Sequence, residues 1–192
     1  MLEFEEIMQD VKSQLKPKRY FHTLGVVITS AYLARLYGES IEKARLAALL
    51  HDCSRNGITE DEMLILAERS LFADEYKEET KGINLLHSVA SEVVAREKYG
   101  ICDREVLRAV RFHTTGRRNM TKLEMIVYSA DMIEPSREYE GVEKLRRLER
   151  SGLEELTFAC CGHTVDYLKA KNCSIHGATL DLYRWLEEKQ KD

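Results

Sequence analysis

Four of the six histidines in this chain stand next to runs of apolar residues. One of the four is followed directly by an aspartate, in the segment "AALLHDCSRNGI" at residues 47–58. An apolar run of this kind normally ends in a cap or a turn, whereas here it ends in two side chains that bind metals well. A further aspartate stands in "VYSADMIEPS". In chain order the set reads His22, His51, Asp52, His87, His113 and Asp131.

Imidazole and carboxylate groups together suit iron, manganese, zinc or nickel. The five cysteines form no CxxC pair, which disfavours a structural zinc site. A mixed set of nitrogen and oxygen ligands with room for water suits hydrolysis, because a metal acidifies bound water and polarises a phosphoryl oxygen. Any one of these histidines, taken alone, is more simply a hydrogen-bonded core residue. The joint pattern instead predicts a buried metal site.

Composition restricts the classes of protein that fit. A length of 192 residues, 44% of them hydrophobic, predicts one folded domain over residues 1–192. The net charge of -4 argues against a nucleic-acid partner, so a phosphate ligand needs local basic, metal or backbone contacts. No apolar run approaches the roughly 18 residues of a membrane span, and the acidic start is unlike a signal peptide. We therefore expect a cytoplasmic protein with reduced cysteines and no membrane partner.

The elements that must position these residues are expected to be helices. The chain has two prolines and no alternating segments typical of strands. We predict an all-α bundle of roughly nine helices, with helical segments at residues 2–15, 18–37, 40–51, 59–72, 86–99, 104–113, 125–133, 141–151, 153–171 and 178–190. Residues 73–84 are expected to form a loop or a short helix, and residues 114–120 a basic turn.

Several helix starts carry capping signals, in which a short polar side chain accepts from free backbone N–H groups. These signals are Ser40, Thr59 with Glu62, Asp103, and Thr121 with Glu124. Pro17 is expected near the first turn of a helix, where its missing N–H costs nothing.

The motifs around the histidines resemble the HD-domain phosphohydrolase superfamily, named after its adjacent His and Asp. Within it, the segments "RYFHTLGVV", "LLHDCSR", "LLHSVAS", "VRFHTTG", "SADMIEPSREYEGVEKLR" and "IHGATLDLY" are similar to the YqeK family. The similarity runs from about residue 3 to residue 188, and the combination of "RxxHTxGV" with "ADxIEPSR" is its specific part. Members of that family are symmetrical bis(5'-nucleosyl)-tetraphosphatases. They cut diadenosine tetraphosphate in the middle into two nucleoside diphosphates.

The resemblance implies a single HD domain whose metal ligands are His22, His51, Asp52 and Asp131. It implies that Asp52, His87 and His113 are catalytic. In the wider superfamily His87 and His113 would hold a second metal, whereas in this family they face the phosphates. A single iron is therefore the preferred cofactor, with manganese, zinc or nickel as alternatives.

The resemblance also implies contacts to the nucleotide substrate. These fall on Arg19, Asp52, Cys53, Ser54, Arg55, His87, His113, Thr114, Asp131, Arg137, Ile175, His176 and Thr179. The last three would close over the base or the ribose. Two of these residues also have a purely structural interpretation. Arg19 could be an ordinary charge on a helix surface, and Cys53 a small buried hydrophobic residue.

This chain departs from the family pattern in two places. After the His-Asp pair the family often has an aromatic residue and Ala-Lys, where this chain has Cys53, Ser54 and Arg55. Arg55 keeps the positive charge of the family's lysine, but it carries that charge on a planar guanidinium group instead of a compact ammonium group. Near the C-terminus, His176-Gly177 replaces the usual His-Pro and Tyr183-Arg184 the usual Tyr-Asn.

The mechanism expected from this pattern is attack of a metal-bound water on an inner phosphoryl group. Arg19, Arg55 and Arg137 would neutralise the other phosphate oxygens. His87 and His113 would donate hydrogen bonds to phosphate, or protonate the leaving group if their pKa values lie near working pH.

Two other functions stay open on the sequence. One is another HD phosphohydrolase, acting on a deoxynucleoside monophosphate, a cyclic nucleotide or a guanosine alarmone. The other is a metal-dependent nucleotide sensor without turnover. A homodimer through a helical face is open as well, although no heptad run predicts a coiled coil.

Overall fold

A computed structural model describes residues 3–75 and 82–191 of the chain. Within these residues the secondary structure consists of ten helices, with no strand. The helices are α1 (Phe4–Gln14), α2 (Pro17–Tyr37), α3 (Ile41–Leu50), α4 (Glu60–Ala67), α5 (Ile83–Glu97), α6 (Arg104–Phe112), α7 (Lys122–Ile133), α8 (Val142–Arg146), α9 (Leu153–Ala170) and α10 (Gly177–Lys189).

The all-α prediction is confirmed, and the helix count is one above the roughly nine expected, because each helical segment forms a helix of its own. The expected helix at 59–72 ends early, at Ala67, since the chain turns so that Phe72 is buried near Phe112. The helix expected at 141–151 ends at Arg146. Residues 76–81 of the expected loop at 73–84 lie outside the described residues. That residues 1–192 form one domain stays a prediction.

The predicted capping signals are all confirmed. Ser40 accepts from the backbone N–H of Lys43, and Asp103 accepts from that of Glu105. Thr59 with Glu62, and Thr121 with Glu124, each form a reciprocal capping box. Pro17 begins α2. Local sequence therefore fixes where several helices start, before any packing is considered.

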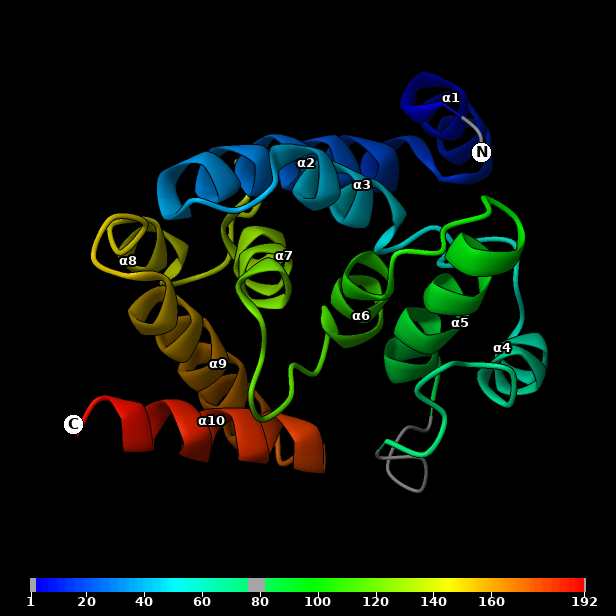
Figure 1. Cartoon of the computed structure of the whole chain (residues 1–192). Helices are drawn as coiled ribbons and strands as arrows, with labels where there is room; N and C mark the ends of the chain where they lie inside the picture. The colour runs from blue at the N-terminus through cyan, green and yellow to red at the C-terminus, as the bar shows by residue number, and fades with distance from the viewer. Residues whose placement is uncertain (1–2, 76–81, 192) are drawn as a thin grey trace.

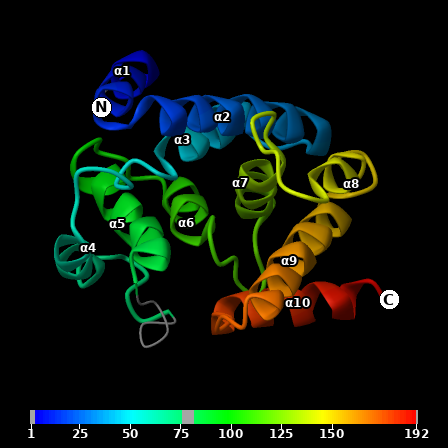
Figure 2. The ribbon, with the colours of Figure 1, turned by 180° about the vertical axis from the view of Figure 1, so that it is seen from behind.

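Helices α6 and α7 lie in the middle of the molecule, between α2 with α3 on one side and α10 on the other (Figure 1). Helix α2 packs against α3 and α7, α5 against α4 and α6, and α9 against α7 and α10. Seen from behind, α4 and α5 flank one end of this arrangement and α8 the other (Figure 2). No helix in the described part of the chain has the length and apolar character that crossing a membrane requires.

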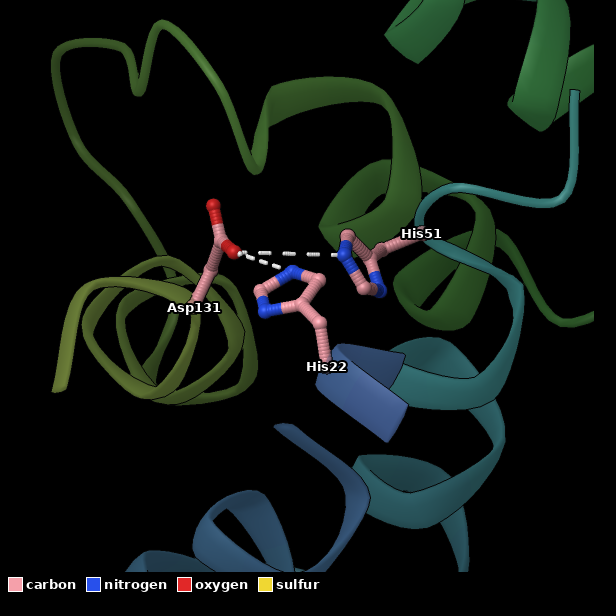
Figure 3. Close-up of side chains that lie close together, drawn as sticks. All are labelled: His22, His51 and Asp131. Carbon is pink, nitrogen blue, oxygen red and sulfur yellow. Dashed lines mark ion pairs between the residues drawn. The ribbon is translucent and has the colours of Figure 1, made fainter. Parts of the chain in front are cut away.

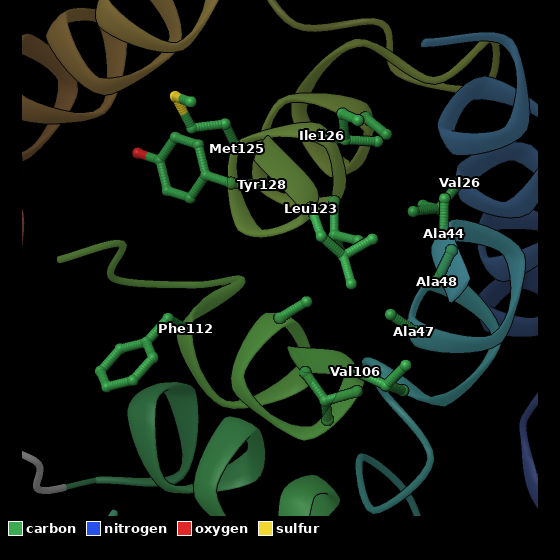
Figure 4. Close-up of a cluster of buried hydrophobic side chains, with 14 of the residues drawn as sticks. Val26, Ala44, Ala47, Ala48, Val106, Phe112, Leu123, Met125, Ile126 and Tyr128 are labelled. Carbon is green, nitrogen blue, oxygen red and sulfur yellow. The ribbon is translucent and has the colours of Figure 1, made fainter. Parts of the chain in front are cut away.

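The main core fills the space between these helices (Figure 4). Ala44, Ala47 and Ala48 of α3 are fully buried and lie between Val26 of α2 and Val106 of α6. Such small side chains allow helix backbones to approach closely. The end of α3, which carries His51, is thereby held deep in the bundle beside α2, α6 and α7.

Candidate metal centre

His51 lies where α3 ends, and it is completely buried. Its Nδ1 donates to the carbonyl oxygen of Ala48 at 2.7 Å, and carbonyls at a helix end otherwise lack a partner. The hydrogen therefore lies on Nδ1 and the lone pair on Nε2. His113 ends α6 in the same way, with Nδ1 donating to the carbonyl oxygen of Val110 at 2.7 Å. Each of these helix ends thus presents a metal-binding nitrogen to the interior.

His22, in the second turn of α2, is oriented by a carboxylate at the end of α7. Its Nδ1 donates to Oε1 of Glu134 at 2.9 Å. Glu134 also accepts from the backbone N–H and the hydroxyl of Ser136, at 2.7 and 2.6 Å. Burial by itself raises the pKa of Glu134, but the hydrogen bonds from His22 and Ser136 hold the pKa below its usual value. Glu134 is therefore ionised, and the lone pair of His22 is on Nε2.

His22 and His51 both point at the carboxylate of Asp131 (Figure 3). Oδ1 of Asp131 lies 2.9 Å from Nε2 of His22 and 3.9 Å from Nε2 of His51. Both nitrogens are buried, and neither has a hydrogen-bond partner of acceptable geometry among the described residues. Buried lone pairs facing a carboxylate oxygen are unfavourable unless a cation joins them. These three ligand atoms lie within 4.8 Å of one another, so they fit a divalent metal ion.

Asp52 extends this cluster towards the other two histidines. Its Oδ2 lies 3.4 Å from Nε2 of His51, and its Oδ1 lies 3.3 Å from Nε2 of His87. With His51 and His113 it forms a second group of atoms close enough to hold a metal ion. All four predicted ligands therefore converge, with Asp52 between the two pairs of histidines.

An arginine anchors each of the two aspartates. Arg19 donates to Oδ2 of Asp52 at 2.8 Å, and Arg137 donates to Oδ1 of Asp131 at 2.6 Å. Burial raises the pKa of Asp131, but the charge of Arg137 and the contact with His22 outweigh it and hold the pKa well below its usual value. The opposite happens at His51. Burial lowers its pKa, but the nearby carboxylates of Asp52 and Asp131 outweigh burial, and the pKa is raised. Both aspartates are therefore ionised and able to act as metal ligands.

His87 and His113 contact each other through their Nε2 atoms, which are 3.1 Å apart. Nη1 of Arg55 lies 2.5 Å from Nδ1 of His87, and because a guanidinium only donates, that Nδ1 accepts. The same nitrogen lies 3.2 Å from the carbonyl oxygen of Ile83, but the shorter contact with Arg55 favours the hydrogen of His87 on Nε2. Burial and the nearby His113 lower the pKa of His87 to about 3, and burial and the nearby His51 lower that of His113 to about 4. Both rings are therefore neutral at pH 7, which disfavours proton donation to a leaving group, and only His87 has an N–H directed at the centre.

The side chains of Cys53 and Ser54 turn into the protein. Sγ of Cys53 donates to the carbonyl oxygen of Ser91 at 3.6 Å, and Oγ of Ser54 donates to that of His87 at 2.8 Å. Burial raises the pKa of Cys53 to about 12. The thiol is therefore neutral and packs as a small buried side chain, which agrees with the structural interpretation of Cys53 from the sequence.

Three predicted nucleotide contacts lie at the start of α10, namely Ile175, His176 and Thr179. Oγ1 of Thr179 donates to the carbonyl oxygen of Thr115 at 2.9 Å, which ties α10 to the turn after α6. In that turn the hydroxyl of Thr114 lies 3.0 Å from Nε2 of His113. The start of α10 thus lies beside the His113 end of the metal centre.

A cavity of about 550 Å³ opens at the His22 end of the centre. Four predicted site residues line it, namely Arg19, His22, Arg55 and Arg137. The lining residues that the sequence did not identify are Lys16, Lys18, Asn56, Glu134, Ser136, Glu138 and Tyr139. Glu134, Ser136, Glu138 and Tyr139 belong to the segment "SADMIEPSREYEGVEKLR", so membership of that motif was the signal that could have identified them. Lys16, Lys18 and Asn56 lie within three residues of Arg19 or Arg55, and closeness to the motifs was their only signal.

Gly25 makes room for the carboxylate of Glu134. A Cβ atom at this position of α2 would lie 2.2 Å from Oε2 of Glu134. That oxygen is held by the backbone of Ser136 and cannot move away without losing its hydrogen bond. Glycine is normally unfavourable inside a helix, so its presence here follows from the close approach of Glu134 to α2.

The fold and the centre together define an HD-domain protein. The HD domain family matches residues 19–136, more than half of the chain, and the chain belongs to that family. It is 40% identical to the protein of Halalkalibacterium halodurans named "Bis(5'-nucleosyl)-tetraphosphatase, symmetrical", over 96% of this chain and 97% of that protein. The Bacillus subtilis protein of the same name is 34% identical, over 95% of this chain and 96% of that protein.

A solved structure shares the fold over almost its whole length. It is described as a predicted HD superfamily hydrolase involved in NAD metabolism from Clostridium acetobutylicum. The TM-score is 0.89 at 34% sequence identity, covering 98% of this chain and 99% of that chain. The similarity therefore extends beyond the HD domain to the helices that follow it.

We predict that Glu134→Gln weakens metal binding about 10- to 100-fold, because the amide no longer holds His22 through a charged acceptor. Affinity for Fe²⁺ would be measured anaerobically by competition with a chromogenic chelator. Glu138→Gln is the matched control, since Glu138 lines the same cavity but is exposed. Equal affinities for the two variants would contradict the role assigned to Glu134.

Gly25→Ala is predicted to lower metal affinity, as Glu134→Gln does, because the added methyl group displaces the carboxylate of Glu134 from His22. The control is Gly162→Ala on α9, whose Cβ would meet Tyr183 at an ordinary 3.6 Å. That control should raise the free energy of unfolding by about 0.4–1 kcal/mol and leave metal binding intact. Unchanged chelator competition for Gly25→Ala would show that Glu134 has room to move.

Proposed function

We propose that this chain hydrolyses diadenosine tetraphosphate and related dinucleoside polyphosphates symmetrically, into two nucleoside diphosphates. The observation that carries the proposal is the convergence of His22, His51, Asp52 and Asp131 beside a cavity lined by basic residues. Relatives that match nearly end to end, and are named for this activity, support the choice of substrate.

When bound, a divalent ion at this centre would polarise a phosphoryl oxygen and acidify a water molecule. The chain's own residues set the geometry around it. Glu134 orients His22, the carbonyl of Ala48 orients His51, and Arg19 and Arg137 hold the two aspartates. Because these groups are fixed before substrate arrives, little reorganisation is needed during the reaction.

We propose that His87 holds a phosphate oxygen of the substrate, in exchange for its present contact with His113. Because Arg55 donates to Nδ1 of His87, the hydrogen of His87 is on Nε2. This nitrogen lies 3.3 Å from Oδ1 of Asp52. Thr114 adds a hydroxyl 3.2 Å from the same nitrogen. A phosphate held here lies next to the metal ligands, which suits charge stabilisation as a nucleoside diphosphate departs.

A single iron ion is the cofactor we propose. Support for one ion comes from the contact between His87 and His113, whose Nε2 atoms already form a hydrogen bond with each other. Support for iron is the mixed imidazole and carboxylate donor set, which manganese, zinc and nickel share. A cytoplasmic location is proposed as well, and the five unpaired cysteines agree with it.

The test is analysis of the products of diadenosine tetraphosphate after anaerobic incubation with the Fe²⁺-loaded protein. We predict ADP as the sole nucleotide product, resolved by anion exchange. Asp52→Ala should lower the rate roughly 100- to 1,000-fold or more, since it removes a ligand and a fixed charge at the reacting centre. Asp61→Ala, at an exposed aspartate of α4, is the matched control and should keep full activity.

Other products would point to other functions. AMP with ATP would mean asymmetric cleavage and would contradict the proposal. Tight nucleotide binding without any product would favour a sensor. Turnover of a deoxynucleoside monophosphate, a cyclic nucleotide or a guanosine alarmone in place of the dinucleotide would indicate another phosphohydrolase activity.

A further inference from the structure

The residues around the metal centre lie on two sides of it. Helix α10, with Thr179 tied to the turn after α6, lies on the opposite side of α6 and α7 from α2 (Figure 1). The cavity of about 550 Å³ opens on the α2 side, at Lys16, Lys18 and Arg19. The start of α10 and the cavity are therefore two separate groups of residues, one on each side of α6 and α7.

The cavity has the size and charge of a site for an anionic small molecule. Its volume of about 550 Å³ is well within the range of roughly 300–1,000 Å³ found for ligand pockets. Five basic and two acidic side chains line it, although the whole chain carries a net charge of -4. Positive charge is therefore concentrated in this cavity, where it raises the local concentration of anions.

The three arginines of the cavity already hold groups of the metal centre. Arg19 donates to Asp52, Arg137 to Asp131, and Arg55 to His87. Lys16 and Lys18 differ, because no acidic side chain in residues 3–75 and 82–191 forms an ion pair with either. The two lysines are thus the cations of this cavity that are free to bind an incoming phosphate.

The cavity also contains an aromatic ring held in a fixed position. The hydroxyl of Tyr139 donates to the carbonyl oxygen of Met132 at 2.7 Å, and its ring lies 4.7 Å from that of His163. A tyrosine fixed in this way loses little entropy when a flat base packs against it.

We propose that this cavity holds the second nucleoside diphosphate half of the substrate, while the first half lies towards α10. Lys16 and Lys18 bind the phosphates of the second half, and its base lies near Tyr139. The inference rests on the proposed function, and it assigns phosphate binding to Lys16 and Lys18, which lie outside the motifs of the sequence.

The test compares the double variant Lys16→Gln/Lys18→Gln with Lys12→Gln, an exposed lysine of α1 that does not line the cavity. In the Fe²⁺-loaded double variant, KM for diadenosine tetraphosphate should rise about tenfold with kcat nearly unchanged, as expected when uniform binding is lost. KM should also increase less steeply with salt concentration in the double variant than in the wild type, because the variant forms fewer ion pairs with the phosphates for salt to screen. Lys12→Gln should match the wild type in both.

Equilibrium dialysis with ADP gives a readout that does not depend on turnover. The wild type should bind two equivalents of ADP and the double variant one. Two equivalents in both proteins, or an unchanged KM and salt dependence, would overturn the inference while symmetric cleavage still stood. If the wild type made no ADP from the dinucleotide, the proposed function would fail, and loss of one ADP equivalent in the double variant would still identify the cavity as a nucleotide site.

Discussion

The arrangement of this molecule depends on one electrostatic constraint, the burial of carboxylates and imidazole lone pairs around a single point. Asp131 faces Nε2 of His22 at 2.9 Å, and that nitrogen has no hydrogen-bond partner of acceptable geometry in the described part of the chain. Two arginines compensate part of the negative charge from the outside, and the unpaired nitrogens remain directed inward. A cation at that point would satisfy every one of these groups at once, and hydrogen bonds from Glu134, Ala48 and the two arginines already orient them towards it.

Two of the buried imidazoles are oriented by their position at the end of a helix. His51 and His113 each follow the last residue of a helix and donate to a carbonyl three residues back. This one hydrogen bond satisfies a helix carbonyl, fixes the tautomer and turns Nε2 towards the centre. His22 lies within a helix instead, and it takes its orientation from Glu134, which reaches α2 only because Gly25 has no side chain.

Much of this could be predicted from the sequence, because caps and ligands are marked by local signals. Asp103 and Thr121 start helices as expected, and the apolar residues before His51 do bury the ligand-bearing end of α3. Glu134 stands in the motif "ADxIEPSR" but was not predicted as a site residue, because its hydrogen bond to His22 joins two helices that are far apart in the sequence. Lys16 and Lys18 were missed because cavity lining depends on how α2 and the loop after α7 meet. The exact end of α4 depends on the burial of Phe72, which is a long-range contact.

The central claim is that the protein binds one metal ion among these residues, and anomalous diffraction at the iron edge from Fe²⁺-loaded crystals tests it most directly. We predict one anomalous peak, in contact with Nε2 of His22 and His51 and with the carboxylates of Asp52 and Asp131. A peak bound only by His87 and His113, or coordination through Nδ1 of His22 or His51, would contradict the assignment. So would the absence of a peak at an iron concentration that supports turnover.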